Sequence, residues 1–201
     1  MAAMNEEERG RVPEDQVRAH TYSLLGALLA AAPGSDLLTL LASVDPESGV
    51  EADFAAAWRQ LAIAASRAEP EELAAEYQDL FIGLGRGEVV PYGSWYMSGF
   101  LMDKPLAALR SDLEALGFER RSEVHEPEDH AAALCETMAM LVADGQDLEV
   151  QQRFFAQHLG PWMGTFFRDL REAKSAQFYR AVGQFGEQFT EFESRYLAMM
   201  V

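Results

Sequence analysis

The segment His125-Glu126-Pro127-Glu128-Asp129-His130 gathers two imidazoles and three carboxylates within six residues. Side chains of these types bind metal ions or exchange protons, so the segment is a candidate metal site or acid–base centre. A zinc protease would need its two histidines at i and i+4 on one helix, in the pattern HExxH. His125 and His130 are five residues apart, and Pro127, best placed at the first position of a helix, leaves His125 outside that helix. A metal-dependent hydrolase using residues 125–130 is therefore the alternative hypothesis and not the main one.

The three acids of this segment have a local explanation as the start of the helix. With Pro127 at the first helical position, Glu126 falls near the N-cap, and Glu128 and Asp129 fall in the first turn. Acids there complement the helix dipole, and each contributes about 0.3–1 kcal/mol when exposed. His130 falls at the border between the apolar stripe of the helix and its polar face. We therefore interpret the acids as helix-start residues and His130 as a candidate wall of a groove.

Two further segments could carry chemistry. Gly83-Leu84-Gly85-Arg86-Gly87 is glycine-rich, but it follows a predicted helix and lacks the lysine of GxxxxGK[ST], which favours a helix C-cap and loop over a nucleotide site. Pro91-Tyr92-Gly93-Ser94-Trp95-Tyr96 lacks the GxSxG pattern, so Ser94 is not predicted to be a nucleophile. The aromatic residues of this segment either fill the core or line an apolar groove, and the sequence leaves both readings open.

Helical periodicity dominates the elements that must position these residues. The predicted helices run from near Pro13 to before Pro33, from Ser35 to Leu41, over Phe54 up to Pro70, from Glu71 to about Leu84, from Leu106 to Leu116, and from Pro127 onward, with two or three more after it. Glycines and prolines break this regularity between Gly83 and Gly99. No strand-like alternation longer than four residues occurs. The sequence predicts an all-α fold, a single compact multi-helix bundle with irregular central loops.

The length and net charge of the chain limit its number of domains and the kinds of partner that it can bind. The chain has 201 residues, and we expect a flexible acidic N-terminus over residues 1–12 and a single domain over residues 13–201. The formal net charge of −17 disfavours nucleic acid and anionic lipid as partners and favours basic ones. A single cysteine, Cys135, excludes an internal disulfide and a cysteine-ligated cluster. The N-terminus lacks a secretory h-region and the longest apolar run is too short to span a bilayer, so we expect a cytoplasmic protein without stable membrane insertion.

Two motifs in a fixed order carry a family resemblance. Tyr77-x-x-Leu80-Phe81 precedes the glycine-rich loop and Pro91-Tyr92-Gly93-Ser94-x-Tyr96, and Glu126-Pro127-Glu128-Asp129-His130 follows about thirty residues later. This order, in an acidic all-α chain of this length, resembles the TorD/DmsD family of redox-enzyme maturation chaperones, relatives of NarJ. The resemblance covers about residues 15–195 and is sharpest between residues 77 and 142.

The resemblance implies a chaperone and not an enzyme. Such proteins bind the twin-arginine signal peptide, or the precursor, of a molybdenum-cofactor oxidoreductase and assist cofactor insertion before export. An all-α chain with long central loops can also exchange helices, so we expect a monomer or a helix-swapped dimer. No cofactor is expected, although weak guanine-nucleotide binding is discussed for the family. The peptide-binding residues that the family motif maps onto this chain are Leu80, Phe81, Tyr92, Ser94, Tyr96, Asp129 and His130. We add Glu126 to this set, because an acid beside an aromatic loop suits the cationic start and apolar run of such a peptide.

Overall fold

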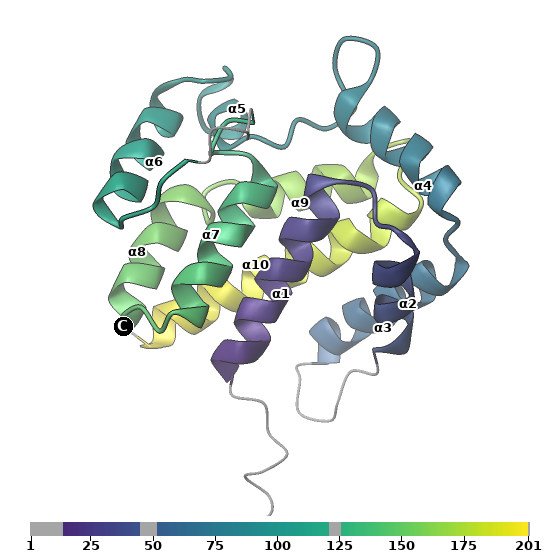
Figure 1. Cartoon of the computed structure of the whole chain (residues 1–201), viewed down its shortest axis with the longest axis horizontal. Coiled ribbons are helices and arrows are strands. Elements are labelled where there is room, and N and C mark those ends of the chain that lie inside the picture. The colour runs from purple at the N-terminus through teal and green to yellow at the C-terminus, as the bar shows by residue number, and fades with distance from the viewer. Residues whose placement is uncertain (1–13, 45–51, 121–125, 201) are drawn as a thin grey trace, which may run out of the picture.

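The computed structural model describes residues 14–44, 52–120 and 126–200, and these ranges fold into helices (Figure 1). In chain order the elements are α1 (Glu14–Ala30), α2 (Ser35–Ser43), α3 (Ala52–Arg67), α4 (Pro70–Tyr77), the π-helical turn η2 (Gln78–Ile82), α5 (Gly93–Ser98), α6 (Lys104–Ala115), α7 (Ala131–Ala143), α8 (Leu148–His158), α9 (Met163–Glu172) and α10 (Phe178–Met200). Within these ranges the only β-type pairing is an isolated bridge between Tyr92 and His130. The predicted all-α class is confirmed. The predicted N-terminal segment 1–12 lies outside the described residues.

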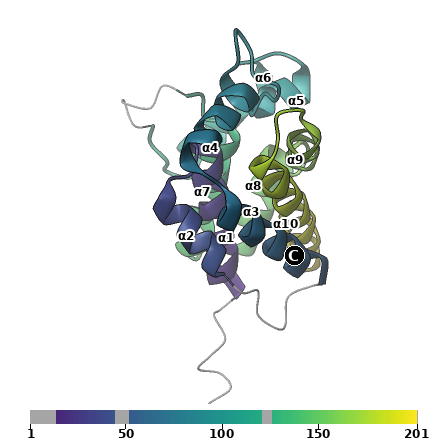
Figure 2. The same cartoon turned by 90° about the vertical axis from the view of Figure 1, so that its right-hand side faces the viewer.

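The helices form two layers around one core. α1 packs along α7, and α10 packs against α9 and α3. Figure 2 shows α1, α2 and α7 on one side of the molecule and α9 and α10 on the other. The apolar stripe of α7 predicts this central position, and the side chains of the stripe are all buried: Ala131, Leu134, Cys135, Met138, Leu141 and Val142.

The aromatic residues of α10 join α3 to the core. Phe185, Phe189 and Phe192 recur at helical spacing on one face of α10, and all three stack on Phe54 of α3 with ring centroids 5.3, 6.0 and 6.1 Å away. Offset aromatic pairs of this kind contribute about 0.5–1.5 kcal/mol each beyond their buried area. The phenylalanine-rich C-terminal sequence therefore serves the core.

Glycine lets α9 approach α10 closely. A Cβ atom at Gly186 would lie 2.3 Å from Cε1 of Phe167, and one at Gly183 would lie 2.7 Å from the backbone oxygen of the same residue. Real Cβ contacts do not reach such distances, so any larger residue at either position would push the two helices apart.

The central segment differs from the sequence prediction in two places. The helix predicted from Glu71 to about Leu84 ends at Ile82, and its last turn is π-helical. The irregular stretch between Gly83 and Gly99 contains a helix, α5, which is too short to show a periodic pattern in the sequence. No helix among the described residues is long and apolar enough to cross a membrane.

Candidate functional site: a groove over helix α7

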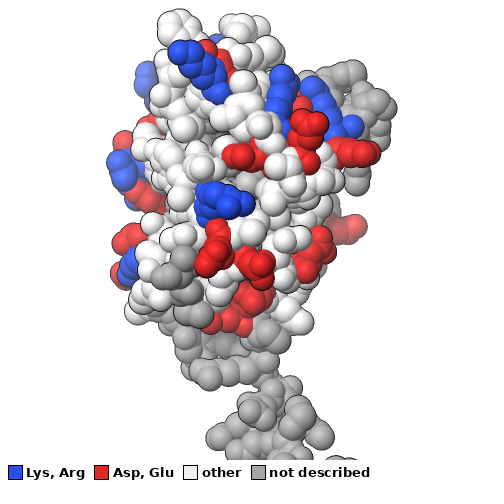
Figure 3. All heavy atoms as spheres, turned by 90° about the vertical axis from the view of Figure 1, so that its left-hand side faces the viewer, with Lys and Arg blue, Asp and Glu red and all other residues white. Residues whose placement is uncertain are grey.

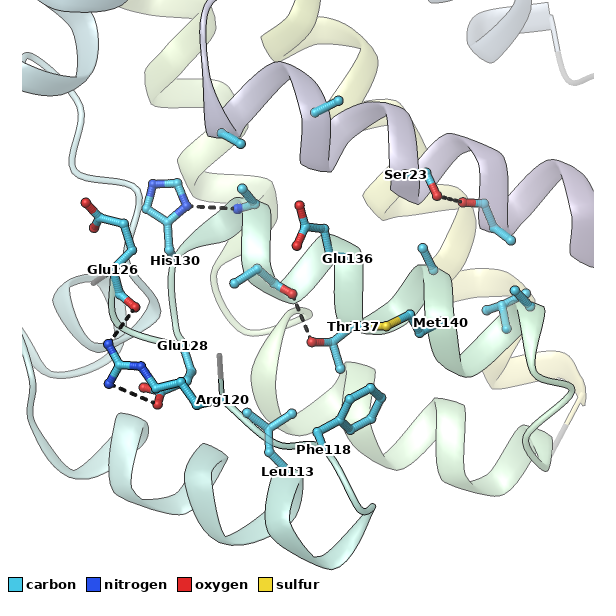
Figure 4. Close-up of a pocket in the computed structure, with 18 of the residues that line it drawn as sticks. Ser23, Leu113, Phe118, Arg120, Glu126, Glu128, His130, Glu136, Thr137 and Met140 are labelled. Atoms are coloured by element: carbon cyan, nitrogen blue, oxygen red, sulfur yellow. Dashed lines mark hydrogen bonds and ion pairs between the residues drawn. The ribbon is translucent and has the colours of Figure 1, made fainter. Parts of the chain in front are cut away.

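A groove of about 1500 Å³ runs over the outer face of α7 (Figure 4). Its walls come from α1 on one side and from α6 with the residues that follow it on the other. One end is formed by residues of η2, by Pro91 and Tyr92, and by the segment before α7. We call this cavity the α7 groove. Its volume exceeds the roughly 300–1,000 Å³ of typical small-molecule pockets, which suits a peptide segment better than a metabolite.

The two sequence motifs meet at one end of the groove. The backbone N–H of Gly93 donates to the carbonyl of Asp129 at 2.9 Å, and the N–H of Ala131 donates to the carbonyl of Pro91 at 2.8 Å. These two bonds flank the isolated antiparallel bridge between Tyr92 and His130. Segments far apart in the sequence are thus held in a fixed register.

Asp129 fastens α5 to this junction between residues 91–93 and residues 129–131. Its carboxylate is almost completely buried, with 3% exposed, and its Oδ2 atom accepts a hydrogen bond from the N–H of Ser94 at 2.8 Å. The free N–H groups at the start of a helix need such acceptors. The other carboxylate oxygen, Oδ1, is buried and has no hydrogen-bond partner among the described residues.

The helix after this segment begins later than predicted. α7 begins at Ala131, so Pro127 is not its first residue, and residues 127–130 form a turn. The prediction that Glu126, Glu128 and Asp129 lie at the helix start is therefore wrong. The backbone bonds to Pro91 and Gly93 compete with an earlier helix start, and these tertiary contacts override the local proline signal.

His130 is the N-cap of α7. Its Nδ1 atom accepts a hydrogen bond from the N–H of Ala132 at 3.1 Å, so the neutral ring carries its proton on Nε2. Burial lowers the pKa of His130 below its ordinary value, although the nearby charges of Glu126 and Asp129 oppose this effect. The ring meets that of Tyr92 edge-to-face at 5.1 Å and lines the groove.

The acids before α7 have different partners. The hydroxyl of Tyr92 donates to the exposed carboxylate of Glu126. Burial and this hydrogen bond together raise the pKa of Tyr92 well above its ordinary value. Glu128 pairs with Arg110 at 2.9 Å and with Arg120 at 3.4 Å. Burial alone would raise the pKa of Glu128, but its arginine partners outweigh burial and lower it.

The remaining predicted residues lie at different depths. Phe81 lines the groove and packs against Tyr77 and Tyr179, whereas Leu80 is fully buried in the core. Ser94 is also fully buried beneath the junction.

Tyr96 is not among the residues that line the groove: its ring stacks on Trp162, and its hydroxyl donates to Asp169 at 2.8 Å. The structure thus brings Phe81, Tyr92, Glu126 and His130 to the groove surface but not the other four residues, and contact of any of the eight with a peptide stays a prediction.

The two other chemical readings find little support in the described geometry. No group of three or more histidine, cysteine or acidic side chains is placed to hold a metal ion within residues 14–44, 52–120 and 126–200. His125, on which the hydrolase alternative depends, lies outside those ranges.

In the glycine-rich loop, Gly83 ends η2 with a φ of 60°, and a Cβ at Gly87 would lie 2.4 Å from the carbonyl oxygen of Leu80. These glycines serve a tight turn, and guanine-nucleotide binding stays untested.

Several groove residues were not predicted from the sequence. Figure 4 shows Glu136 in the half of the groove beside Glu126 and His130, and Leu113, Phe118 and Met140 in the other half. Glu136 and Met140 occupy the exposed face of α7, where polar and apolar residues alike are ordinary. The walls formed by α1 and α6 turn that face into a groove, and the sequence carries no signal for that packing.

Comparison with known proteins places the chain in a family. Residues 47–168 match the family model described as nitrate reductase delta subunit, which covers more than half of the sequence. The chain belongs to this family. Among its relatives, the chaperone protein TorD of Shewanella pealeana is 27% identical over 213 residues, which cover 97% of this chain and 96% of the relative. The chaperone protein TorD of Vibrio cholerae is 28% identical over 141 residues, which cover 65% of this chain and 64% of the relative.

A solved structure supports the fold. The crystal structure of an Archaeoglobus fulgidus protein described as a redox enzyme maturation protein superposes with a TM-score of 0.56 at 18% identity, covering 93% of this chain and 99% of that one. The match to the family model confirms the predicted family. Its relatives carry the name of chaperones and not of enzymes, which agrees with the predicted non-enzymatic role.

Proposed function

We propose that the protein is a cytoplasmic chaperone that binds the twin-arginine signal peptide, or the precursor, of a molybdenum-cofactor oxidoreductase and assists cofactor insertion before export. The observation that carries this proposal is the α7 groove, because both family motifs meet at its end and it combines acidic with apolar lining. The relatedness to TorD chaperones supports it independently.

The groove offers what such a peptide needs. A twin-arginine signal has a cationic start followed by an apolar run. Carboxylates match the guanidinium fork, and half-buried aromatic side chains accept apolar groups. Glu126 provides the first kind of contact, and Phe81 and Tyr92 provide apolar surface beside it for the residues next to the arginine pair.

The buried motif residues have a supporting role in this proposal. Asp129 and Ser94 hold α5 against the segment before α7, and Leu80 anchors η2 in the core. They set the positions of Tyr92, His130 and Phe81 without facing the groove. We therefore expect their substitution to change peptide affinity through stability and geometry, and substitution of groove-facing residues to change it directly.

The test is calorimetric titration of the full-length protein with a twin-arginine signal peptide from a molybdoenzyme precursor. A peptide with both arginines changed to glutamine serves as the control. We expect saturable binding of the first peptide, weakened by added salt because the contacts are charged. Equal affinity for both peptides, or no binding, would contradict the proposal.

His130→Asn and His130→Ala separate binding from folding. Asparagine keeps an acceptor for the N–H of Ala132, and alanine does not. If the ring contacts the peptide, both variants lose affinity while the asparagine variant keeps its helical signal and melting temperature. Full affinity in a stable His130→Asn variant would remove His130 from the binding surface.

A further inference from the structure

We infer that the α7 groove binds its peptide in one direction, with the arginine pair at Glu136 and Glu126 and the apolar run over Leu113, Phe118 and Met140. This inference rests on the proposed function and extends it to residues outside the family motifs. It assigns Glu136 as a specificity-determining carboxylate and assigns the wall made by α6 as the apolar subsite.

Glu136 is held in the groove by the packing of α1 on α7. A Cβ atom at Gly26 of α1 would lie 3.1 Å from Cγ of Glu136, so the missing side chain at Gly26 leaves room for the stem of Glu136. The carboxylate is exposed and has no hydrogen bond or ion pair with another described residue. Figure 4 shows it on the same side of the groove as Glu126 and His130.

The cations of the groove do not neutralise these two acids. Arg110 binds the carboxylate of Glu128, and Arg120 binds that carboxylate and the backbone carbonyl of Glu126. The side chain of Glu126 receives only the neutral hydroxyl of Tyr92 among the described residues. Within the described ranges, two carboxylates without a cationic partner therefore face one half of the groove, and an arginine pair would supply the missing charge with matched geometry.

The opposite half carries an apolar patch, with the carboxylate of Glu114 at its edge. Met140 of α7 is 43% exposed, and Leu113 and Phe118 are half-buried on the facing wall. Figure 4 shows these three side chains gathered on the α6 side of α7, away from Glu126. Methionine adapts its shape to different apolar partners, which suits a subsite that receives an apolar run of variable sequence.

The separation of this apolar patch from Glu126 and Glu136 gives the groove a direction (Figure 4). A segment whose positive charges precede its apolar run satisfies both halves only when the charges lie beside the start of α7. The reversed segment would put guanidinium groups against Met140 and Phe118 and apolar side chains against the carboxylates of Glu126 and Glu136, so both ends would be mismatched.

A double-mutant cycle tests the contact with Glu136. The protein carries Glu136→Gln, and the peptide carries glutamine in place of the arginine pair. We expect Glu136→Gln to weaken the arginine peptide about tenfold, which is the scale of one charge-assisted contact. The same substitution should change the affinity of the glutamine peptide less than about twofold, because no charge remains to couple.

A matched control separates this contact from the general field of the groove. Glu114→Gln removes the same charge from α6, beside the apolar wall. We expect it to weaken the arginine peptide by less than about twofold, as for an exposed charge without direct contact. Equal losses for the two variants would overturn the assignment of Glu136.

Photo-crosslinking tests the direction. A benzophenone side chain is placed either before the arginine pair or within the apolar run, and the crosslinked residues are found by mass spectrometry. We expect the apolar-run probe to label α6 and the C-terminal half of α7, and the other probe to label the segment before α7. The reverse pattern, or identical patterns from both probes, would overturn the inference.

The outcomes distinguish this inference from the function on which it rests. If the wild-type protein binds no twin-arginine peptide, the proposed function fails. If it binds with full preference for arginine but shows neither coupling to Glu136 nor a directional crosslink, the proposed function stands and only this inference fails.

Discussion

Glutamate is used in two opposite ways in this molecule. In the interior, Glu193 belongs to a cluster with Arg18, Tyr22 and Gln151, which we call the Arg18 cluster. Arg18 binds both oxygens of Glu193, at 2.7 and 3.0 Å, and Tyr22 donates to the same carboxylate at 3.0 Å. On the wall of the α7 groove, Glu136 has no such partner among the described residues.

The two regions differ in whether their carboxylates must be compensated within the protein. The Arg18 cluster is almost fully buried, so each of its charges must be compensated within the protein. The groove is open to water, so an unpaired carboxylate is tolerated there and is available to a ligand. Figure 3 shows the face that carries α6 and α8, where blue cationic atoms lie beside red acidic ones and further acidic groups stand alone.

The largest expected effect comes from breaking the Arg18 cluster. Arg18→Met should lower the free energy of unfolding by about 3–5 kcal/mol, because it leaves the carboxylate of Glu193 buried without a cation. Urea denaturation followed by circular dichroism measures this loss. The double variant Arg18→Met/Glu193→Met should recover most of it, and a single-variant loss below about 1 kcal/mol would contradict the comparison.

A smaller effect is expected where the junction meets the groove. Asp129→Ala removes the acceptor for the N–H of Ser94 and should cost about 1 kcal/mol, the usual value of an N-cap. Asp129→Asn keeps an acceptor and should cost less. Hydrogen exchange should locate the change in α5, and a uniform loss of protection across α1 and α10 would instead give Asp129 a global role.

The His130 cap should make stability depend on pH. Its pKa lies below the unfolded value of about 6.5, so the unfolded chain binds the proton first and stability falls as pH drops through and below that value. Each unit by which folding lowers the pKa of His130 contributes about 1.4 kcal/mol to this loss of stability. Denaturation at pH 7.5 and pH 5.5 should show a smaller decrease for His130→Asn than for the wild type, and an equal decrease would assign the pH dependence to other groups.

The smallest expected effect on stability is that of changing Glu136, the groove residue that is compared with Glu193. Glu136→Gln should change the free energy of unfolding by less than about 0.5 kcal/mol, because an exposed carboxylate without a partner contributes little. Thermal unfolding checks this value. A loss comparable to that of Arg18→Met would mean that Glu136 is a structural residue and not a residue left free for a ligand.

The sequence predicted the fold class and the meeting of two motifs, but not the shape of the groove. Helical periodicity is a local signal, so most helices could be placed from it. The late start of α7 could not be placed, because the backbone bonds of Gly93 and Ala131 across the junction decide it. Glu136 gave no signal either, since its role depends on Gly26 of α1 and on the wall of α6, and both contacts are tertiary.

The most direct test of the central claim is hydrogen exchange of the full-length protein with and without a saturating twin-arginine peptide. Another exposed apolar surface, the turn that carries Phe100 and Met102, each 71% exposed, offers the competing location. We predict that the peptide slows exchange in α7, in the facing part of α1 and in residues 126–130, with no change in residues 97–102. Protection confined to residues 97–102 would contradict the assignment of the α7 groove as the peptide-binding site.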